Sequence, residues 1–331
     1  MATTSSRPLK VGLHLPHWEG GIDGVTPRWA DLLALARTAE AVGFDSLWVA
    51  DHSWTVESEF YEGIGRPVPP EVADMPPGGL WEGWTLLTAL AVATSRVELG
   101  MLVACTGFRN PALLAKMADT LDEISGGRLI LGLGAGDSMF EHRAMGYPTD
   151  HLVSRFEEAL TIIQRLLREG RLDFTGTYYR FDGFELRPRG PRPSGPPILI
   201  GTLANRPRML RLVTQHADIW NGWVAYERNH PDVVPPMRKR VDAACHLHGR
   251  DPATLERSLT IQVAQPGYEV PGSDPMTGSP EELAASLRAL AAEGIGHIQI
   301  FLMPTTPATV DEFGAVLDLL DSDEFGIAMK A

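Results

Sequence analysis

The stretch GFDSLWVADH, residues 43–52, contains the unit from which the fold is predicted. Gly43 is a typical helix stop, because glycine adopts the left-handed backbone conformation at low cost. The run Ser46–Ala50 is short and mostly apolar, as buried parallel strands are. Asp51 and His52 follow it directly, so two polar side chains stand where the strand ends. This order of helix stop, strand and polar strand end is typical of an α/β protein.

Outward from this unit, short apolar strands and longer amphipathic helices alternate along the chain. Further strands are expected at Leu9–Leu15, Val97–Val103, Arg128–Gly132, Ile198–Ile200, Ala217–Trp220, Leu259–Val263 and His297–Phe301. Helices are expected at Pro27–Val42, Trp81–Thr94, Pro111–Ile124, Val153–Glu169, Pro207–His216, Val233–His248, Pro280–Ala292 and Val310–Leu320. Thr26 is the expected N-cap of the first helix.

Eight strands separated by helices require crossover connections, so the strands are expected to run parallel. The pattern predicts an α/β fold of the (β/α)8 TIM-barrel type. The alternative is an open doubly wound sheet, which usually has fewer strands and a glycine-rich dinucleotide loop after the first strand. No such loop follows Leu15. The barrel is therefore the prediction.

Three segments do not belong to an idealised barrel. Residues 57–79 and 265–279 are rich in Gly and Pro and follow the second and seventh strands. They are expected at the C-terminal face, where barrel enzymes keep their active sites, as lids or substrate walls. Residues 172–185 are expected to form an inserted hairpin. The prediction is a single domain over residues 1–331, with the barrel at about 9–320.

Composition and charge argue against several classes of protein. The 331 residues include 29 basic and 42 acidic ones, a net charge of -13, so no nucleic-acid partner is expected. No apolar run approaches the ~20 residues that span a membrane, and Met1–Arg7 lacks the apolar stretch of a signal peptide. Two cysteines form no disulfide framework. A globular cytoplasmic protein is expected.

Polar residues that directly follow barrel strands are the first candidates for chemistry. Asp51 and His52 place a carboxylate beside an imidazole, which can set the tautomer and the pKa of a proton-transfer group. The simpler interpretation is that Asp51 caps a loop and His52 makes a structural hydrogen bond, and the sequence leaves both open. Cys105 is better interpreted as a small buried residue than as a nucleophile, because no signature pairs it with a base.

Two glycine-rich turns follow the fourth and fifth strands: GLGAGD, residues 132–137, and IGTLAN, residues 200–205. Glycines let backbone N–H groups approach a phosphate or a ring closely, and the second turn leads into a helix whose N-terminus could hold an anion. Neither turn is a P-loop or a Rossmann fingerprint. A metal is not expected, since the ten histidines form no ligand pattern with Asp or Glu.

Several motifs together resemble the luciferase-like superfamily of flavin- and deazaflavin-dependent oxidoreductases. They are Gly43–His52, Arg109–Met117, Leu121–Arg128, Leu131–Gly136, Arg155–Leu160, Pro196–Gly201 and Ala217–Asn221. The resemblance extends over about residues 9–320. It implies a barrel enzyme that binds a reduced flavin, or the deazaflavin coenzyme F420, at the C-terminal ends of the strands.

The resemblance also implies roles for particular residues. Asp51 and His52 would lie at the reactive edge of the cofactor ring, with His52 as the acid–base partner. The residues expected to support or bind the cofactor are Asp51, Leu102, Val103, Ala104, Cys105, Ala135, Gly136, Asp137, Gly201 and Thr202. The segment 102–105 would form a bulge with a non-proline cis peptide behind the ring, and the later residues would lie by the phosphate or ribityl chain.

The Asp-His pair and the glycine-rich run after the fourth strand look most like the deazaflavin-dependent branch. The resemblance therefore favours coenzyme F420 and hydride transfer to or from a small organic substrate. Two alternatives stay open: an FMN-dependent monooxygenase that uses dioxygen, and a non-catalytic flavin-binding protein. A homodimer is also implied by the resemblance.

The sequence departs from the family pattern in two places. Residues 137–142 differ from the Trp-Phe pattern that usually follows the glycine-rich turn. Residues 16–18 stand where sugar-phosphate-binding members carry an acidic residue, so a sugar phosphate is not the expected substrate. The candidates for an apolar substrate pocket are His17, Trp18, Trp54 and Trp81. The alternative is that these aromatic residues belong to the core.

Overall fold

The computed structural model describes residues 7–63, 66–203, 206–225 and 228–322. At its centre is a barrel of eight strands, β1 (Lys10–His14), β2 (Ser46–Val49), β5 (Glu98–Met101), β7 (Leu129–Gly134), β10 (Ile198–Thr202), β11 (Ile219–Trp223), β12 (Glu256–Ala264) and β13 (His297–Met303). Every one of them pairs in parallel with a neighbour on each side, and the β1–β13 and β7–β10 pairings close the ring. The predicted (β/α)8 barrel is confirmed.

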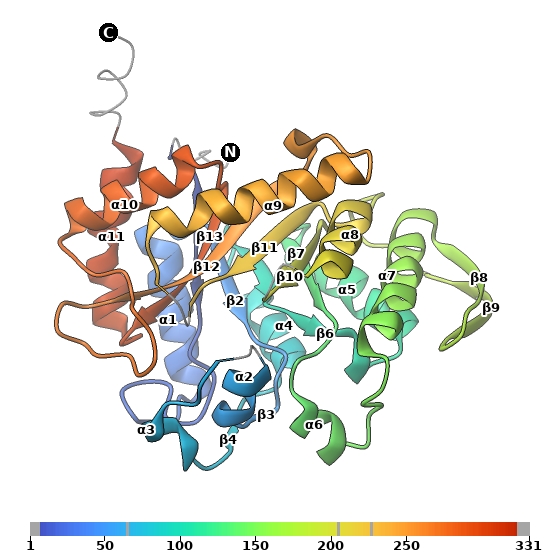
Figure 1. Cartoon of the computed structure of the whole chain (residues 1–331), viewed down its shortest axis with the longest axis horizontal. Coiled ribbons are helices and arrows are strands. Elements are labelled where there is room, and N and C mark those ends of the chain that lie inside the picture. The colour runs from blue at the N-terminus through green and yellow to red at the C-terminus, as the bar shows by residue number, and fades with distance from the viewer. Residues whose placement is uncertain (1–6, 64–65, 204–205, 226–227, 323–331) are drawn as a thin grey trace, which may run out of the picture.

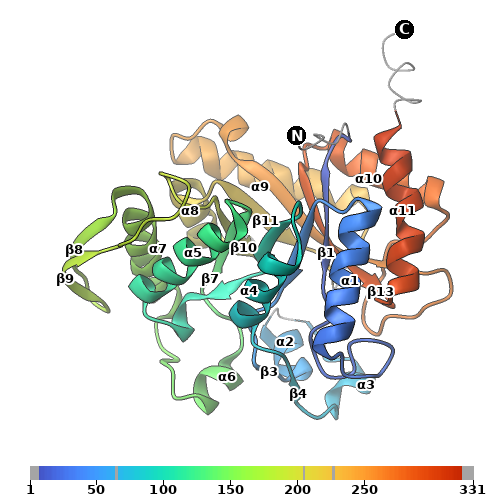
Figure 2. The ribbon, with the colours of Figure 1, turned by 180° about the vertical axis from the view of Figure 1, so that it is seen from behind.

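Helices cover the outside of the barrel, as Figures 1 and 2 show from two sides. They are α1 (Trp29–Val42), α4 (Gly83–Ala93), α5 (Pro111–Ser125), α7 (Leu152–Glu169), α8 (Pro207–His216), α9 (Val234–Leu247), α10 (Pro280–Ala292) and α11 (Pro307–Asp321). Each turns an apolar stripe toward the strands. In α7 the buried stripe includes Phe156, Leu160, Ile163 and Leu167, which recur every three or four residues.

Additional elements gather at one end of the barrel, the lower end in Figure 1. They are β3 (Trp54–Thr55), α2 (Glu57–Gly63), α3 (Pro70–Ala73), β4 (Gly78–Gly79) and α6 (Met139–Ala144). Because they follow strands β2 and β7, this end is the C-terminal face. The two Gly/Pro-rich insertions meet here, where the Tyr61 hydroxyl donates to the carbonyl of Pro271 at 3.3 Å. A cavity of about 420 Å³ lies between Glu71 and residues 268–277.

The third inserted segment forms the predicted hairpin. Strands β8 (Arg171–Thr175) and β9 (Arg180–Glu185) pair with each other in antiparallel fashion, outside the barrel sheet. The hairpin follows α7 and projects sideways from the barrel (Figure 1). It therefore connects a helix to a strand and, unlike the other two insertions, does not belong to the C-terminal face. Short remaining elements are β6 (Ala104–Cys105), η1 (Thr106–Phe108), η2 (Pro231–Val233) and η3 (Pro252–Thr254).

Several element boundaries differ from the predicted ones for identifiable reasons. Helix α4 begins at Gly83, two residues late, because the Glu82 carboxylate caps it by accepting from the N–H groups of Trp84 and Thr85. Helix α1 begins at Trp29, and the Asp31 carboxylate, not Thr26, bonds the backbone N–H that precedes it. The third strand ends at Met101 because a bulge follows. Strand β10 runs on to Thr202 through its pairing with β11.

The interior of the barrel is part apolar and part polar. Trp48, Ile130, Leu199 and Ile219 form one buried cluster, with Leu102 at its edge. A polar network fills another part of the interior. There Asn221 Nδ2 donates to Gln299 Oε1 at 2.9 Å, and His297 Nε2 lies 2.7 Å from the Ser46 hydroxyl. The side chains at the C-terminal ends of the same strands rest on this filled interior.

Candidate active site

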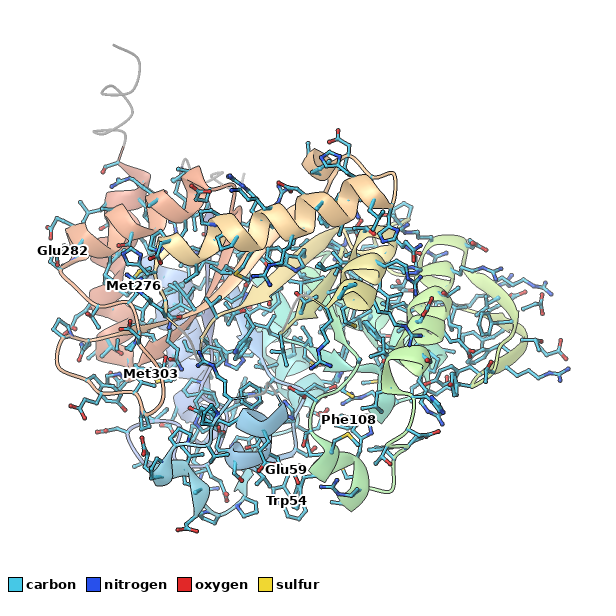
Figure 3. The ribbon with its side chains drawn as sticks, in the orientation of Figure 1. Trp54, Glu59, Phe108, Met276, Glu282 and Met303 are labelled. Atoms are coloured by element: carbon cyan, nitrogen blue, oxygen red, sulfur yellow. The ribbon has the colours of Figure 1, made fainter. Side chains whose placement is uncertain are left out.

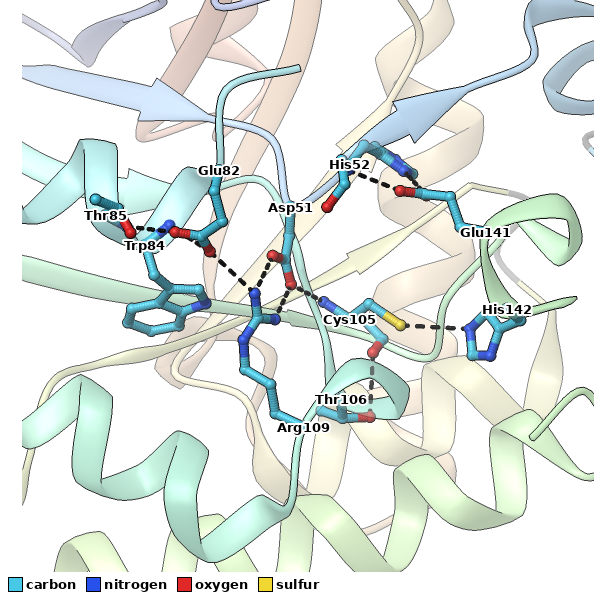
Figure 4. Close-up of polar contacts among 12 residues, drawn as sticks. Asp51, His52, Glu82, Trp84, Thr85, Cys105, Thr106, Arg109, Glu141 and His142 are labelled. Carbon is cyan, nitrogen blue, oxygen red and sulfur yellow. Dashed lines mark hydrogen bonds and ion pairs between the residues drawn. The ribbon is translucent and has the colours of Figure 1, made fainter. Parts of the chain in front are cut away.

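His52, directly after β2, is held by a buried carboxylate from α6. Its Nδ1 donates to Glu141 Oε2 at 2.5 Å, and Glu141 Oε1 accepts the backbone N–H groups of Ser53 at 2.7 Å and Trp54 at 3.1 Å (Figure 4). Glu141 has no solvent exposure. With both oxygens engaged, it fixes the position of the loop and the orientation of the imidazole. The bond at Nδ1 leaves Nε2 for other partners.

The surroundings of His52 favour its protonated form. Burial alone would lower its pKa, but the hydrogen bond to Glu141 and the charges of Asp137 and Glu141 outweigh that effect and raise the pKa to about 9. Asp137 Oδ1 stands 3.9 Å from Nε2, and the His52 side chain is 26% exposed. Near pH 7 the residue is therefore an imidazolium whose Nε2 proton lies at the C-terminal face.

Asp51 points away from His52 and into an ion pair. Arg109 donates from Nη1 to Asp51 Oδ2 at 2.6 Å and from Nη2 to Oδ1 at 2.7 Å, and the backbone N–H of Cys105 also reaches Oδ2 at 2.9 Å. Figure 4 shows this arrangement, in which Glu82 also contacts Arg109. The carboxylate is buried and fully engaged. These contacts tie the end of β2 to the bulge.

The bulge after β5 has the backbone geometry that the resemblance implied. The Leu102–Val103 peptide bond is cis. The Val103 side chain occupies space over two neighbouring strands. A Cβ added at Gly134 would lie 2.5 Å from Val103 Cγ2, and one added at Gly201 would lie 3.1 Å from Cγ1. The lack of side chains at these two glycines therefore makes room for Val103, whose side chain is a partly exposed apolar surface at the barrel mouth.

Cys105 is a buried thiol and not a nucleophile. Burial raises its pKa, and its Sγ lies 3.6 Å from His142 Nε2. His142 donates from Nδ1 to the carbonyl of Pro148 at 2.7 Å, so its Nε2 accepts the thiol proton. The interpretation of Cys105 as a small buried residue holds. A Cβ added at Gly136 would lie 2.8 Å from this sulfur, which explains a glycine there.

The predicted cofactor-binding segments converge on one part of the mouth. Leu102–Cys105 contacts the strand that leads to Ala135 and Gly136, and Asp137 lies beside His52. Gly201 lies next to Val103. Thr202 is buried and its hydroxyl accepts from Trp220 Nε1 at 2.7 Å, so its side chain serves the barrel. Residues 204 and 205 of the second glycine-rich turn lie outside the described residues.

The predicted substrate-pocket residues do not come together as one wall. His17 is fully buried, and both its nitrogens bond to backbone: Nδ1 to the carbonyl of Trp81 at 2.9 Å and Nε2 to the N–H of Ala50 at 2.9 Å. These bonds fix the imidazole within the fold, and its place in a substrate pocket stays a prediction. Trp81 is half exposed and donates from its indole to Pro27. Trp54 packs edge-on against Phe140 of α6, at the end of the molecule shown low in Figure 3.

Trp18 instead joins aromatic side chains that were not predicted. Its ring centroid lies 6.0 Å from that of His14 and 6.3 Å from that of Phe301. Trp223 meets Phe301 edge-on at 5.4 Å. His14 and Trp223 end strands β1 and β11, Trp18 follows β1, and Phe301 lies two residues before the end of β13, so they stand near the mouth of the barrel. Among the residues that the structure describes, no group of three His, Cys, Asp or Glu side chains is arranged to hold a metal.

The structure is a parallel barrel with a carboxylate-held histidine at the C-terminal ends of its strands, the end at which TIM-barrel enzymes keep their active sites. The family model described as luciferase-like monooxygenase matches residues 9–265, and the chain belongs to that family. The predicted resemblance to this superfamily is thereby confirmed. Within the described ranges, no helix is both long and apolar enough to cross a membrane.

The chain is also similar to curated oxidoreductases. The 5,10-methylenetetrahydromethanopterin reductase of Archaeoglobus fulgidus is 30% identical over 67% of this chain and 57% of its own. The F420-dependent hydroxymycolic acid dehydrogenase of Mycobacterium tuberculosis is 30% identical over 70% of this chain and 58% of its own. The chain thus spans little more than half the length of these relatives.

The fold of the whole chain is matched more completely. An F420-dependent secondary alcohol dehydrogenase, solved with an F420-acetone adduct, superposes with a TM-score of 0.72 at 20% identity, over 93% of this chain and 99% of its own. A monooxygenase from Streptomyces bottropensis superposes with a TM-score of 0.68 at 18% identity, over 95% and 98%. At such identities the likeness shows the barrel fold.

Sequence reasoning missed three residues that shape this site: Glu141, Arg109 and His14. The first two act through contacts far along the chain, 89 residues from His52 and 58 from Asp51. One signal was available for Glu141, since it follows the glycine-rich turn after the fourth strand and so belongs to the same face as His52. His14, as the last residue of the first strand, had the same signal.

Proposed function

We propose that the protein is an oxidoreductase that moves a hydride between coenzyme F420 and a small organic substrate, with His52 as the proton donor and acceptor. The observation that carries this proposal is the imidazolium of His52, oriented by buried Glu141 and with Nε2 at the barrel mouth. A hydride added to a carbonyl carbon leaves a negative charge on oxygen, which must be protonated. His52 is placed and charged for that step.

The residues at the mouth fit a deazaflavin or flavin. Val103 gives an apolar, partly exposed support for a flat ring, and glycines beneath it keep side chains out of the way. Helix α8 starts after β10 with Arg206 as N-cap, whose side chain makes no cap hydrogen bond, and this N-terminus is our candidate for the phosphate site. When bound, F420 supplies a ring carbon that carries the hydride. The protein's part is to hold the ring, orient the substrate and transfer the proton.

In the reducing direction, His52 donates its Nε2 proton to the substrate oxygen and becomes neutral. Glu141 keeps the Nδ1 proton in place, so the neutral imidazole retains one tautomer. In the oxidising direction, the same Nε2 accepts the hydroxyl proton of an alcohol. Asp51 and Arg109 hold the loop and the bulge at a fixed distance from each other.

The named relatives favour F420, since an F420-dependent dehydrogenase is among those 30% identical. An FMN-dependent monooxygenase is the second candidate, because the family model that matches the chain is described as luciferase-like monooxygenase. Titration of the apo-protein with F420 and with FMN, each oxidised and reduced, separates them through intrinsic Trp fluorescence. Tight binding of F420 with weak binding of FMN supports the proposal.

The opposite preference would make the protein a flavin enzyme, and oxygen uptake would then be the next measurement. If neither cofactor binds, the proposal is wrong. Binding without turnover on any alcohol, ketone or imine would favour the non-catalytic flavin-binding protein.

We also propose that the protein works as a cytoplasmic homodimer. Exposed apolar side chains on two packed outer helices support an interface: Val92 on α4 and Leu113 on α5 are 76% and 54% exposed. The buried free thiols Cys105 and Cys245 are compatible with a reducing compartment. Light scattering after gel filtration measures the mass, and a monomer would contradict the dimer.

A further inference from the structure

Two neighbouring histidines at the end of the first strand have opposite surroundings. Both nitrogens of His17 bond to backbone groups. His14, three residues earlier, is 2% exposed, and among the described residues neither of its ring nitrogens makes a hydrogen bond of ordinary geometry, a weak interaction with the backbone of Leu15 aside. Burial lowers the pKa of His14 well below its usual value, so the imidazole is neutral and presents one donor and one acceptor.

His14 points into the barrel at its mouth. Two residues earlier, a Cβ added at Gly12 would collide with Ser46 and Trp48 in the interior. Because side chains alternate along a strand, His14 faces the same interior, one layer nearer the C-terminal face. Its ring stacks on Phe301 with the centroids 4.1 Å apart. It therefore forms part of the floor on which a ligand at the mouth would rest.

The packing of the fold alone does not account for a histidine here. A buried polar group without a partner destabilises the folded state, and a phenylalanine would stack on Phe301 without that penalty. The rings above His14 differ from it in exposure, since Trp18 and Phe301 are both partly open to solvent. The imidazole nitrogens themselves are covered, so a ligand can reach them only if one of these rings turns aside.

We propose that His14, beneath the rings of Trp18, Phe301 and Trp223, is the hydrogen-bonding end of the substrate site, and that the substrate is an uncharged, largely apolar ketone or alcohol. This inference rests on the proposed function. The aromatic rings contact the apolar body of the substrate, and the neutral imidazole bonds its oxygen. A neutral His14 offers no charge to a carboxylate or phosphate substrate.

The reaction at this site is balanced by groups already named. In the reducing direction, the carbonyl carbon receives the hydride of the reduced cofactor and the carbonyl oxygen receives the Nε2 proton of His52. The substrate leaves as an alcohol, and the cofactor is left oxidised. His14 takes no part in the proton transfer. It holds the oxygen, and so acts on binding.

The test compares His14→Phe with wild type, using the protein loaded with oxidised F420. The probes are acetophenone, an uncharged aromatic ketone, and 2-oxoglutarate, a ketone with two carboxylates, with binding followed by calorimetry. We expect acetophenone to bind and 2-oxoglutarate not to bind. In His14→Phe the Kd for acetophenone should rise about tenfold, the value of one lost hydrogen bond, and the Kd for F420 should stay the same.

The Tm of the variants distinguishes a binding role of His14 from a structural one. The Tm of His14→Phe should equal or exceed that of wild type, whereas His17→Phe, which loses two backbone bonds, should have a lower Tm. His14→Asn, which keeps a donor and an acceptor, should retain part of the acetophenone affinity.

Three results would overturn the inference while leaving the proposed function intact: unchanged acetophenone binding in His14→Phe, a fall in its Tm like that of His17→Phe, or preferred binding of 2-oxoglutarate. A rise in the Kd for F420 would assign His14 to the cofactor and also overturn it. Failure of wild type to bind F420 would instead remove the proposed function on which the inference rests.

Discussion

At the scale of single residues, the site depends on how carboxylates are shared among cations. Arg109 takes both oxygens of Asp51, which leaves His52 to Glu141 and Asp137. Asp51 and His52 are thus adjacent in the sequence but do not bond to each other. Adjacent residues of a strand end point in opposite directions, and each finds its partner on a different element. In the proposed function, His52 is therefore the residue that transfers the proton.

Replacement of His52 by alanine tests that role. The variant should lose turnover by ~10²–10⁴-fold, the usual contribution of a general acid or base. Its affinity for F420 should remain, because Val103 and the α8 N-terminus are untouched. Steady-state turnover and a fluorescence titration measure the two properties. Turnover equal to that of wild type would contradict a proton-transfer role.

The pKa of His52 gives a second prediction at this scale. Ketone reduction needs the imidazolium, so its rate should be level below about pH 9 and fall above it. In Glu141→Gln one of the charges that raise this pKa is lost while Asp137 remains, so the fall should move down from about pH 9 toward the usual value near 6.5. Alcohol oxidation should show the mirror-image profile.

Glu59→Gln is the matched control, because Glu59 binds Arg143 of the same helix α6 at 2.8 Å without contact to His52. Its pH profile should match that of wild type. If Glu141→Gln also left the profile in place, Glu141 would be a structural residue only.

At the scale of elements, the sequence was sufficient for what depends on local pattern. Each barrel strand is a short apolar run, and each long helix has its own periodic stripe, so all eight pairs were predictable. Helix α6 was not, because its six residues are too few for a periodic signal. The sequence placed Gly134 and Gly201 in turns that approach a phosphate or a ring, which stays a prediction, but it could not show that both also make room for Val103.

Gly132 tests that account of the bulge. A Cβ there would lie 2.0 Å from the carbonyl oxygen of Met101, a backbone atom that cannot turn aside. Gly132→Ala should therefore lower the free energy of unfolding by about 1–3 kcal/mol, as overpacking does, and weaken cofactor binding by shifting the bulge. Gly78→Ala, where the nearest atom is 4.0 Å away, should leave both unchanged. Urea denaturation and F420 titration measure them, and equal stability of the two variants would contradict the account.

At the scale of the whole molecule, charges join the ends of the described chain and histidines fill its centre. Arg7 donates to Asp321 at 2.7 Å and to Asp45 at 3.3 Å, which joins the start of the barrel to its last helix. Inside the barrel and at its mouth, His14, His17 and His297 are buried and neutral. The net charge of -13 says nothing about the protonation of these histidines. Their neutral state follows from burial in the packed interior and is measured by titration.

The stability of the fold should therefore fall on acidification earlier than carboxylates alone would cause. Burial lowers the pKa of His17 to about 4 and that of His297 to about 3, and the pKa of His14 is also well below 6.5. As the pH falls from 6.5 to 5, the unfolded chain binds protons at these three sites and the folded chain does not. The free energy of unfolding should drop with a slope that approaches about 4 kcal/mol per pH unit.

His52, whose pKa is raised, is protonated in both the folded and the unfolded state in this pH range, and its own contribution to stability is lost only as the pH rises toward 9. Urea denaturation at a series of pH values measures the slope of unfolding free energy against pH. In His14→Phe this slope should be smaller than in wild type by the contribution of about one proton. A slope of less than one proton in wild type would mean that these histidines become charged within the folded barrel.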